Sequence, residues 1–129
     1  MIRVLIVDDQ LAFRKHAVRL LQSAGMDVVA EADNIAEAEV QVRLHRPDLA
    51  LVDLMLPEMN GIEGTARLKA LHPSLRVILV SAMGNHFDAL RAAALEAGAE
   101  DFVPKDALCS DRVRTWQQPE WRSPGADTG

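Results

Sequence analysis

Four short runs of apolar residues constrain the fold of this chain more than any other feature. They are rich in Val, Ile and Leu, and apolar residues do not alternate with polar ones inside them. Such runs are typical of strands buried on both faces, as in a parallel sheet, because a half-exposed strand alternates. The sequence therefore predicts strands at residues 2–7, 27–31, 48–53 and 75–80, with a short fifth strand at Asp101–Pro104.

The stretches between these runs have helical spacing. An apolar stripe over residues 13–24, followed by Gly25, predicts the first helix and its end. Asn34 and Asn60 each stand three residues before a glutamate, the capping-box pattern, so helices two and three are predicted to begin there. A fourth helix is predicted over residues 85–97.

Alternation of strand and helix predicts the fold class α/β, as a doubly wound, five-stranded parallel sheet with helices on both faces. A chain of 129 residues, 49% of them hydrophobic, has the size and apolar content of one domain. We expect that domain over residues 1–116. Residues 117–129 lack periodicity and include Pro119 and Pro124, which favours a disordered tail.

The fifth helix, expected over residues 107–116, has few apolar anchors. They are Leu108, Val113 and Trp116. A helix with so few anchors would cover little of the sheet, so we expect it to be weak or displaced and one face of the sheet to be partly open. An open apolar face would favour a homodimer or an exchanged helix.

Charge and composition exclude several classes of protein. The net charge of −5 argues against a large sequence-independent contact with nucleic acid, so direct nucleic-acid binding is not expected. No apolar run approaches the roughly 18 to 20 residues of a membrane-spanning helix, and the first run is too short for a signal peptide. The single cysteine, Cys109, fits a reducing compartment, and we expect a cytoplasmic protein.

Polar groups follow the predicted strands at the ends where ligands bind in open parallel sheets. Alone, each has an ordinary explanation as a helix cap, a loop hydroxyl or a solvated charge. Together they place three carboxylates, a hydroxyl and an ammonium on one edge of the sheet. The groups are Asp8 and Asp9 after the first strand, Asp53 at the end of the third, Ser81 after the fourth and Lys105 after the fifth.

Three neighbouring carboxylates would repel one another unless a cation joined them, and oxygen ligands in a partly hydrated site suit Mg²⁺. The ammonium and the hydroxyl would then hold an anion at the same metal, as phosphoryl transfer requires. Because no activated Ser or Cys is evident, a carboxylate is the expected nucleophile and an acyl phosphate the expected product.

These motifs together resemble the response-regulator receiver family of two-component signal transduction, over residues 1 to about 106. The set is specific because the paired acids, the Asp-x-x-x-Pro-x-x-x-Gly element, the Ser and the Lys occur in the family's order. The matching segments are Val7-Asp8-Asp9, Asp53-Leu-Met-Leu-Pro57-Glu-Met-Asn-Gly61, Val80-Ser81-Ala82 and Phe102-Val-Pro-Lys105.

The resemblance implies a flavodoxin-like fold with strand order 2-1-3-4-5. It implies that Asp53 accepts a phosphoryl group from a sensor histidine kinase or phosphotransfer protein. It further implies that Asp9, Asp53 and the backbone carbonyl of Met55 bind Mg²⁺, with Asp8 assisting through water.

The resemblance also implies a switch. Ser81 and Lys105 would hold the phosphoryl oxygens, and Phe102 would rotate inward as Ser81 moves toward them. The surface of helix four, strand five and helix five would then change and contact a downstream protein target.

Other functions remain open. A phosphatase-type hydrolase also forms an aspartyl phosphate, but such enzymes usually need an acid where this chain has Met55, and a cap over the substrate. A receiver-like interaction module without phosphorylation, and a truncated receiver of a DNA-binding transcriptional regulator, are further alternatives. We favour the switch, which is not an enzyme beyond self-phosphorylation and self-dephosphorylation.

Overall fold

Five parallel strands form the centre of the computed structural model, which describes residues 1–82 and 87–117. The strand order β2-β1-β3-β4-β5 confirms the flavodoxin-like topology. The strands are β1 (Arg3–Val7), β2 (Asp27–Ala32), β3 (Leu49–Asp53), β4 (Arg76–Ser81) and β5 (Asp101–Pro104). The helices are α1 (Leu11–Ser23), α2 (Ile35–His45), α3 (Gly61–Leu71), α4 (Phe87–Glu96) and α5 (Ser110–Thr115), with a 3-10 turn η1 at Lys105–Ala107.

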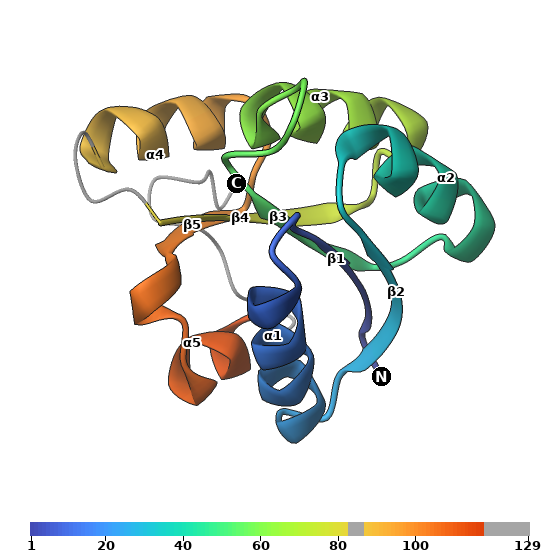
Figure 1. Cartoon of the computed structure of the whole chain (residues 1–129), viewed down its shortest axis with the longest axis vertical. Coiled ribbons are helices and arrows are strands. Elements are labelled where there is room, and N and C mark those ends of the chain that lie inside the picture. Colours follow the sequence, from blue (N-terminus) through green and yellow to red (C-terminus); the bar gives the residue numbers. More distant parts are fainter. Residues whose placement is uncertain (83–86, 118–129) are drawn as a thin grey trace, which may run out of the picture.

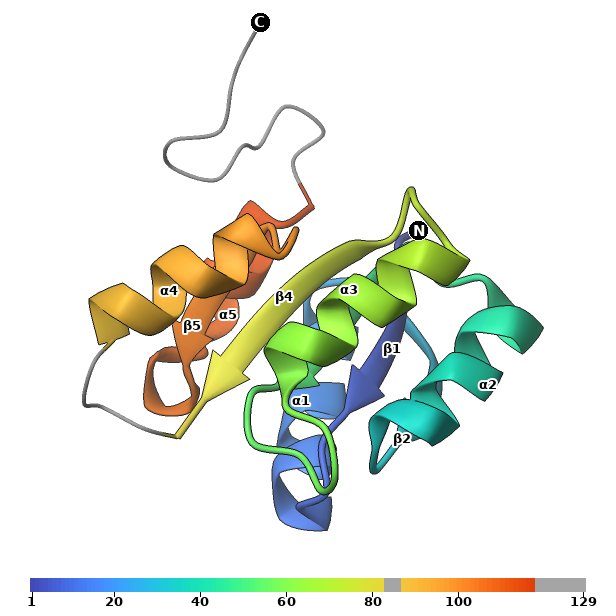
Figure 2. The same ribbon diagram turned by 90° about the horizontal axis from the view of Figure 1, so that it is seen from above.

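Helices cover both faces of this sheet. In Figure 1, α1 and α5 lie on one side of the strands and α2, α3 and α4 on the other; Figure 2 shows α3 and α4 from above, on the same side of β4. Successive strand residues point to opposite faces, so Leu5 and Val7 pack in one apolar cluster and Val4 and Ile6 in a second. Among the described residues, no helix is both long and apolar enough to span a bilayer.

The predicted helix starts are confirmed where side-chain caps form. The side chain of Asn34 accepts a hydrogen bond from the backbone N–H of Glu37 at 2.8 Å, and Asn60 accepts one from Glu63 at 2.9 Å. Each cap satisfies a backbone donor that has no partner inside the helix. The predicted start of the fourth helix, at residue 85, lies outside the described residues.

The expectation of an open sheet face is wrong. Helix α5 is short, at six residues, yet Val113 and Trp116 are fully buried and Leu108 is 6% exposed. These anchors pack against β-strand side chains of the second cluster. The large indole of Trp116 covers part of the sheet face that the short helix alone would leave open. The reason for expecting a homodimer or an exchanged helix is thereby lost.

Asp101, the first residue of β5, attaches α5 to the sheet. Its side chain is 1% exposed, and Arg112 donates two hydrogen bonds to it at 2.9 Å. The indole N–H of Trp116 donates a third hydrogen bond at 3.2 Å. The side chain of Gln117 donates a hydrogen bond to the carbonyl of Ala24. The rest of the predicted tail lies outside the described residues.

Candidate functional site

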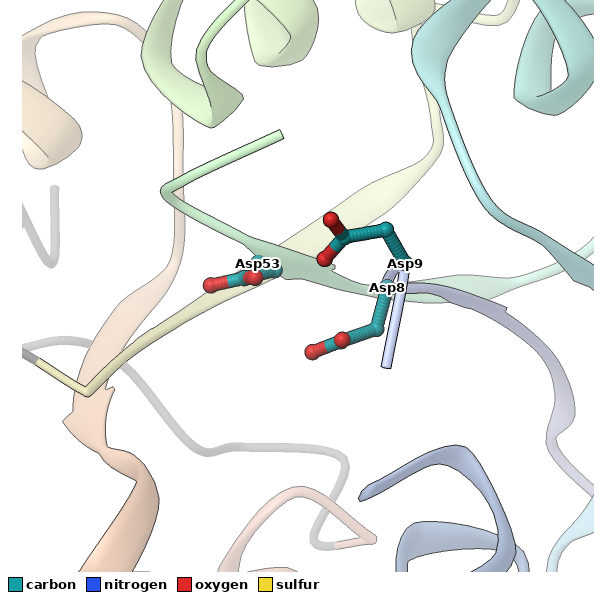
Figure 3. Close-up of side chains that lie close together, drawn as sticks. All are labelled: Asp8, Asp9 and Asp53. Carbon is teal, nitrogen blue, oxygen red and sulfur yellow. The ribbon is translucent and has the colours of Figure 1, made fainter. Parts of the chain in front are cut away.

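Three carboxylates lie together at the carboxyl ends of β1 and β3. Asp8, Asp9 and Asp53 each offer an oxygen within 4.8 Å of the others (Figure 3). The sheet register explains their proximity, because Val7 pairs with Val52 and the aspartates follow on the two neighbouring strands. Asp8 and Asp53 are buried at 0% and 4% exposure, whereas Asp9 is exposed.

Lys105 brings a positive charge to this cluster from the carboxyl end of β5. Its Nζ lies 2.7 Å from Asp8 Oδ2 and 3.4 Å from Asp53 Oδ2, and its side chain is 12% exposed. The ammonium therefore contacts both buried carboxylates. The structure thus places the predicted lysine and the predicted acids in one site.

The local electrostatics disfavour a charged Asp53. Burial raises the pKa of Asp53, and the negative charge of Asp8 raises it further. The charge of Lys105 and the backbone N–H of Met55, which lies 3.3 Å from Asp53 Oδ1, act in the opposite direction. A cation at the cluster would relieve the repulsion that burial strengthens.

The residues present fit a hard divalent cation. Asp8 Oδ1 accepts a hydrogen bond from the backbone N–H of Gln10 at 2.8 Å. Asp8 Oδ2 is buried and, among the described residues, forms an ion pair with Lys105 but accepts no well-aligned hydrogen bond. A buried oxygen with unused acceptor capacity, beside two further carboxylates, is the donor set that Mg²⁺ prefers.

The loop after β3 returns to the strand end at Gly61. The N–H of Gly61 donates to the carbonyl of Leu54 at 2.8 Å. A Cβ at this position would lie 2.5 Å from the carbonyl oxygen of Asp53 and 3.0 Å from Leu54 Cα, so a larger residue would collide with backbone. This close approach gives a physical reason for the glycine in the Asp-x-x-x-Pro-x-x-x-Gly element.

The predicted switch residues lie on β4, which pairs with β3, and on β5, which pairs with β4. Ser81 ends β4, is 1% exposed, and stands one position beyond Val80, which pairs with Asp53. Phe102 of β5 is fully buried and stacks on Phe87 of α4, with ring centroids 5.1 Å apart and planes inclined by 21°. The side chain of Met55 is 57% exposed.

Three side chains of the β1–α1 region reach the site and were not predicted to do so. Gln10 Oε1 lies 3.3 Å from Lys105 Nζ, and the ring centroid of Phe13 lies 4.4 Å from the same atom. Arg14 donates to the carbonyl oxygen of Asp8 at 2.7 Å. Their position within five residues after the paired acids was the available signal, but Phe13 was assigned only to the apolar stripe of the helix.

Comparison with known proteins identifies the family of this chain. Residues 4–113 match the family described as the response regulator receiver domain. The chemotaxis protein CheY of Bacillus subtilis (strain 168) is 40% identical over 111 residues, which cover 86% of this chain and 90% of that protein. The transcriptional regulatory protein LnrK of the same strain is 37% identical over 115 residues, but the match spans only 51% of its length.

A solved structure of a relative is similar throughout the fold. The CheX–CheY–BeF3–Mg²⁺ complex from Borrelia burgdorferi matches with a TM-score of 0.78 and 29% identity, over 87% of this chain and 83% of that chain. Receiver domains of this kind are phosphoacceptor switches that bind Mg²⁺ at an acidic pocket and interact with histidine kinases and downstream targets. The chain belongs to the response regulator receiver family of two-component systems.

Proposed function

We propose that Asp53 is the phosphoacceptor of this receiver domain and takes its phosphoryl group from a sensor histidine kinase or a phosphotransfer protein. One observation carries the proposal: the carboxylate of Asp53, at the end of the central strand β3, lies within 4.8 Å of the carboxylates of Asp8 and Asp9 and 3.4 Å from the ammonium of Lys105. A nucleophile, acidic metal ligands and a cation for the transferred group therefore meet at one point.

The chemistry follows from these groups. An oxygen of Asp53 attacks the phosphorus atom of a phosphohistidine; the new P–O bond forms as the P–N bond breaks, and the imidazole nitrogen keeps the electron pair and takes a proton. The ammonium of Lys105 stabilises the negative charge of the phosphoryl oxygens. We assign the Ser81 hydroxyl to a second contact with those oxygens. The product is an acyl phosphate on Asp53.

We assign Mg²⁺ binding to Asp9, Asp53 and the backbone carbonyl of Met55, with Asp8 acting through a water molecule. The unused acceptor capacity of Asp8 Oδ2 and the proximity of the three carboxylates support this assignment. The bound ion supplies charge neutralisation at the phosphoryl group. Because a ligand of the folded state raises stability, millimolar Mg²⁺ should raise the melting temperature of the wild type more than that of Asp9→Asn.

The proposal is tested by incubating the protein with Mg²⁺ and phosphoramidate and reading its intact mass. We expect a gain of one phosphoryl group, which Asp53→Asn and a chelator abolish. Asp48→Asn is the matched control, because Asp48 is an exposed aspartate just before the opposite end of β3, where it accepts the N–H of Arg3 at 2.9 Å. Asp48→Asn should gain one phosphoryl group, as the wild type does. No gain in a wild type with intact circular dichroism would instead favour an unphosphorylated interaction module.

We propose that catalysis is limited to self-phosphorylation and self-dephosphorylation. Met55 supports this, since its thioether offers no general acid two residues after Asp53. With excess acetyl phosphate, the acyl phosphate should accumulate on the protein. Rapid, repeated release of inorganic phosphate without accumulation would indicate a hydrolase.

We propose that the output surface is formed by α4, β5 and α5 and contacts a protein target. Phe102 stacks on Phe87 of α4, while the preceding residue, Asp101, holds α5, so one strand contacts both helices. Addition of Mg²⁺ and beryllium fluoride should shift amide NMR signals across these three elements, compared with Mg²⁺ alone. Shifts confined to the ends of β1 and β3 would contradict the proposal.

A second candidate is that this receiver controls a DNA-binding transcriptional regulator, which the match to LnrK supports. In either case we propose that the chain itself does not bind DNA, because its net charge is −5. A gel-shift assay with phosphorylated and unphosphorylated protein tests this, and retarded DNA would refute it. We also propose a cytoplasmic location, which cell fractionation would check.

A further inference from the structure

We propose that Phe13 is a positioning residue whose ring holds the ammonium of Lys105 at the acidic site when the carboxylates are occupied by a cation. The inference rests on the proposed role of Asp53. It starts from one contact: Lys105 Nζ lies 4.4 Å from the centroid of the Phe13 ring, within the range in which a ring face attracts a cation. The ring comes from α1 and the lysine from the end of β5.

The partners of this ammonium are of two kinds. Asp8 Oδ2 at 2.7 Å and Asp53 Oδ2 at 3.4 Å are charged, whereas Gln10 Oε1 at 3.3 Å and the Phe13 ring are not. A divalent cation at the cluster repels the ammonium and takes up the negative charge of the carboxylates. The uncharged partners do not ligate the cation in our assignment and therefore keep their attraction.

Of the two uncharged partners, the Phe13 ring is the stronger candidate for holding the ammonium of Lys105. Gln10 is exposed, so water competes for its amide oxygen. Phe13 is partly buried against the second apolar cluster and also lies near His16, with ring centroids 6.4 Å apart, so its position is fixed by packing. The Lys105 side chain is only 12% exposed, which limits solvent screening of the contact.

This arrangement has different consequences for the two steps of the phosphorylation cycle. Before transfer, a metal-loaded site without the ring would leave the flexible lysine free to sample unproductive positions, and fewer molecules would have the ammonium in place. After transfer, the phosphoryl group itself attracts the ammonium. Loss of the ring should therefore slow phosphorylation of Asp53 and leave its dephosphorylation nearly unchanged.

The first experiment measures both steps in Phe13→Leu. At saturating Mg²⁺, the rate of phosphorylation by phosphoramidate should fall about 5- to 30-fold, the range that corresponds to loss of a partly desolvated cation–π contact. Decay of the acyl phosphate, and Mn²⁺ affinity measured by electron paramagnetic resonance, should stay within about twofold. Leu20→Ala is the matched control, because Leu20 packs against the same cluster near the other end of α1. Neither rate should change. An unchanged phosphorylation rate in Phe13→Leu would overturn the proposal.

A second experiment separates ring electronics from packing. Mono-, di- and trifluorophenylalanine, incorporated at position 13 alone, keep nearly the size of the ring but progressively weaken the negative potential of its face. The logarithm of the phosphorylation rate should fall with each added fluorine. A flat series beside a slow Phe13→Leu variant would show that the ring only fills space, and the proposal would be wrong.

A third measurement does not depend on phosphorylation. The lysines of the chain are Lys15, Lys69 and Lys105, so their ε-methylene NMR signals are readily assigned by substitution. With Mg²⁺ bound, the Lys105 signal should show an upfield ring-current shift that disappears in Phe13→Leu. A Lys105 shift equal to that of exposed Lys15 would refute the contact. If the wild type were never phosphorylated, the proposed function would fail while this measurement still decided the inference.

Discussion

Replacing Arg112 by methionine should loosen the attachment of α5 to the sheet. The guanidinium donates through Nε and Nη2 to the two oxygens of Asp101, each at 2.9 Å, and the carboxylate is 1% exposed. The pKa of Arg112 is raised because its side chain donates these hydrogen bonds to Asp101. Methionine keeps much of the apolar stem but leaves the buried carboxylate without its cation.

The magnitude follows from the burial of the two partners. Breaking a fully buried ion pair by removing one partner costs about 3 to 5 kcal/mol. Here the arginine side chain is 38% exposed, which screens the pair, and Asp101 keeps hydrogen bonds from Trp116 Nε1 at 3.2 Å and the N–H of Phe102 at 2.9 Å. We therefore expect a loss of about 2 kcal/mol, or about 6 to 12 °C in melting temperature.

Urea unfolding followed by circular dichroism measures this loss, and the same helix supplies the control. Arg114 pairs with Asp111 at 2.9 Å, but the two side chains are 62% and 92% exposed. Arg114→Met should therefore cost less than about 0.5 kcal/mol. Equal losses in the two variants would refute the conclusion that the burial of Asp101, and not the number of ion pairs, secures α5.

Three further predictions concern the strand end, a helix cap and the buried charge. Gly61→Ala should cost about 1 to 3 kcal/mol in urea unfolding and slow phosphorylation, because its Cβ would lie 2.5 Å from the carbonyl oxygen of Asp53. Asn60→Ala should cost about 1 kcal/mol by the same assay, since the N–H of Glu63 loses its 2.9 Å acceptor, and an unchanged midpoint would contradict the cap. In chelator, Asp53→Asn should be more stable than the wild type at neutral pH, because the wild type must bury the charge of Asp53. Burial raises the pKa of Asp53, so this carboxyl takes up a proton as the pH falls, and the difference in stability should shrink. If the difference between the melting temperatures of the two proteins did not change with pH, the raised pKa of Asp53 would be contradicted.

Much of the fold could be predicted because local signals agree with the final packing. Uninterrupted apolar runs mark β1, β3 and β4, which lie inside the sheet, and the two Asn caps mark the starts of α2 and α3. The strand ends also predicted that Asp8, Asp9, Asp53 and Lys105 would meet, because parallel strands bring their carboxyl ends to one edge. The chemical roles assigned to these residues stay predictions.

What could not be predicted depends on contacts between distant residues. The coverage provided by α5 rests on the volume of Trp116 and on the pairing of Asp101 with Arg112, and neither has a periodic signature. The contact of Phe13 with Lys105 joins the first helix to the end of the last strand. A count of apolar residues in one helix underestimated how much of the sheet α5 covers, because the count ignored these partners.

The sheet separates two apolar clusters that share no side chain, since alternate strand residues belong to opposite faces. Substitutions on different faces should therefore add in their effects on stability, as they do for sites without common partners. Such independence allows the two sides of the molecule to evolve at different rates. The packing under α2 and α3 can change while the α1–α5 side keeps its own packing, whereas β1, β3, β4 and β5 supply side chains to both clusters and are constrained from both faces.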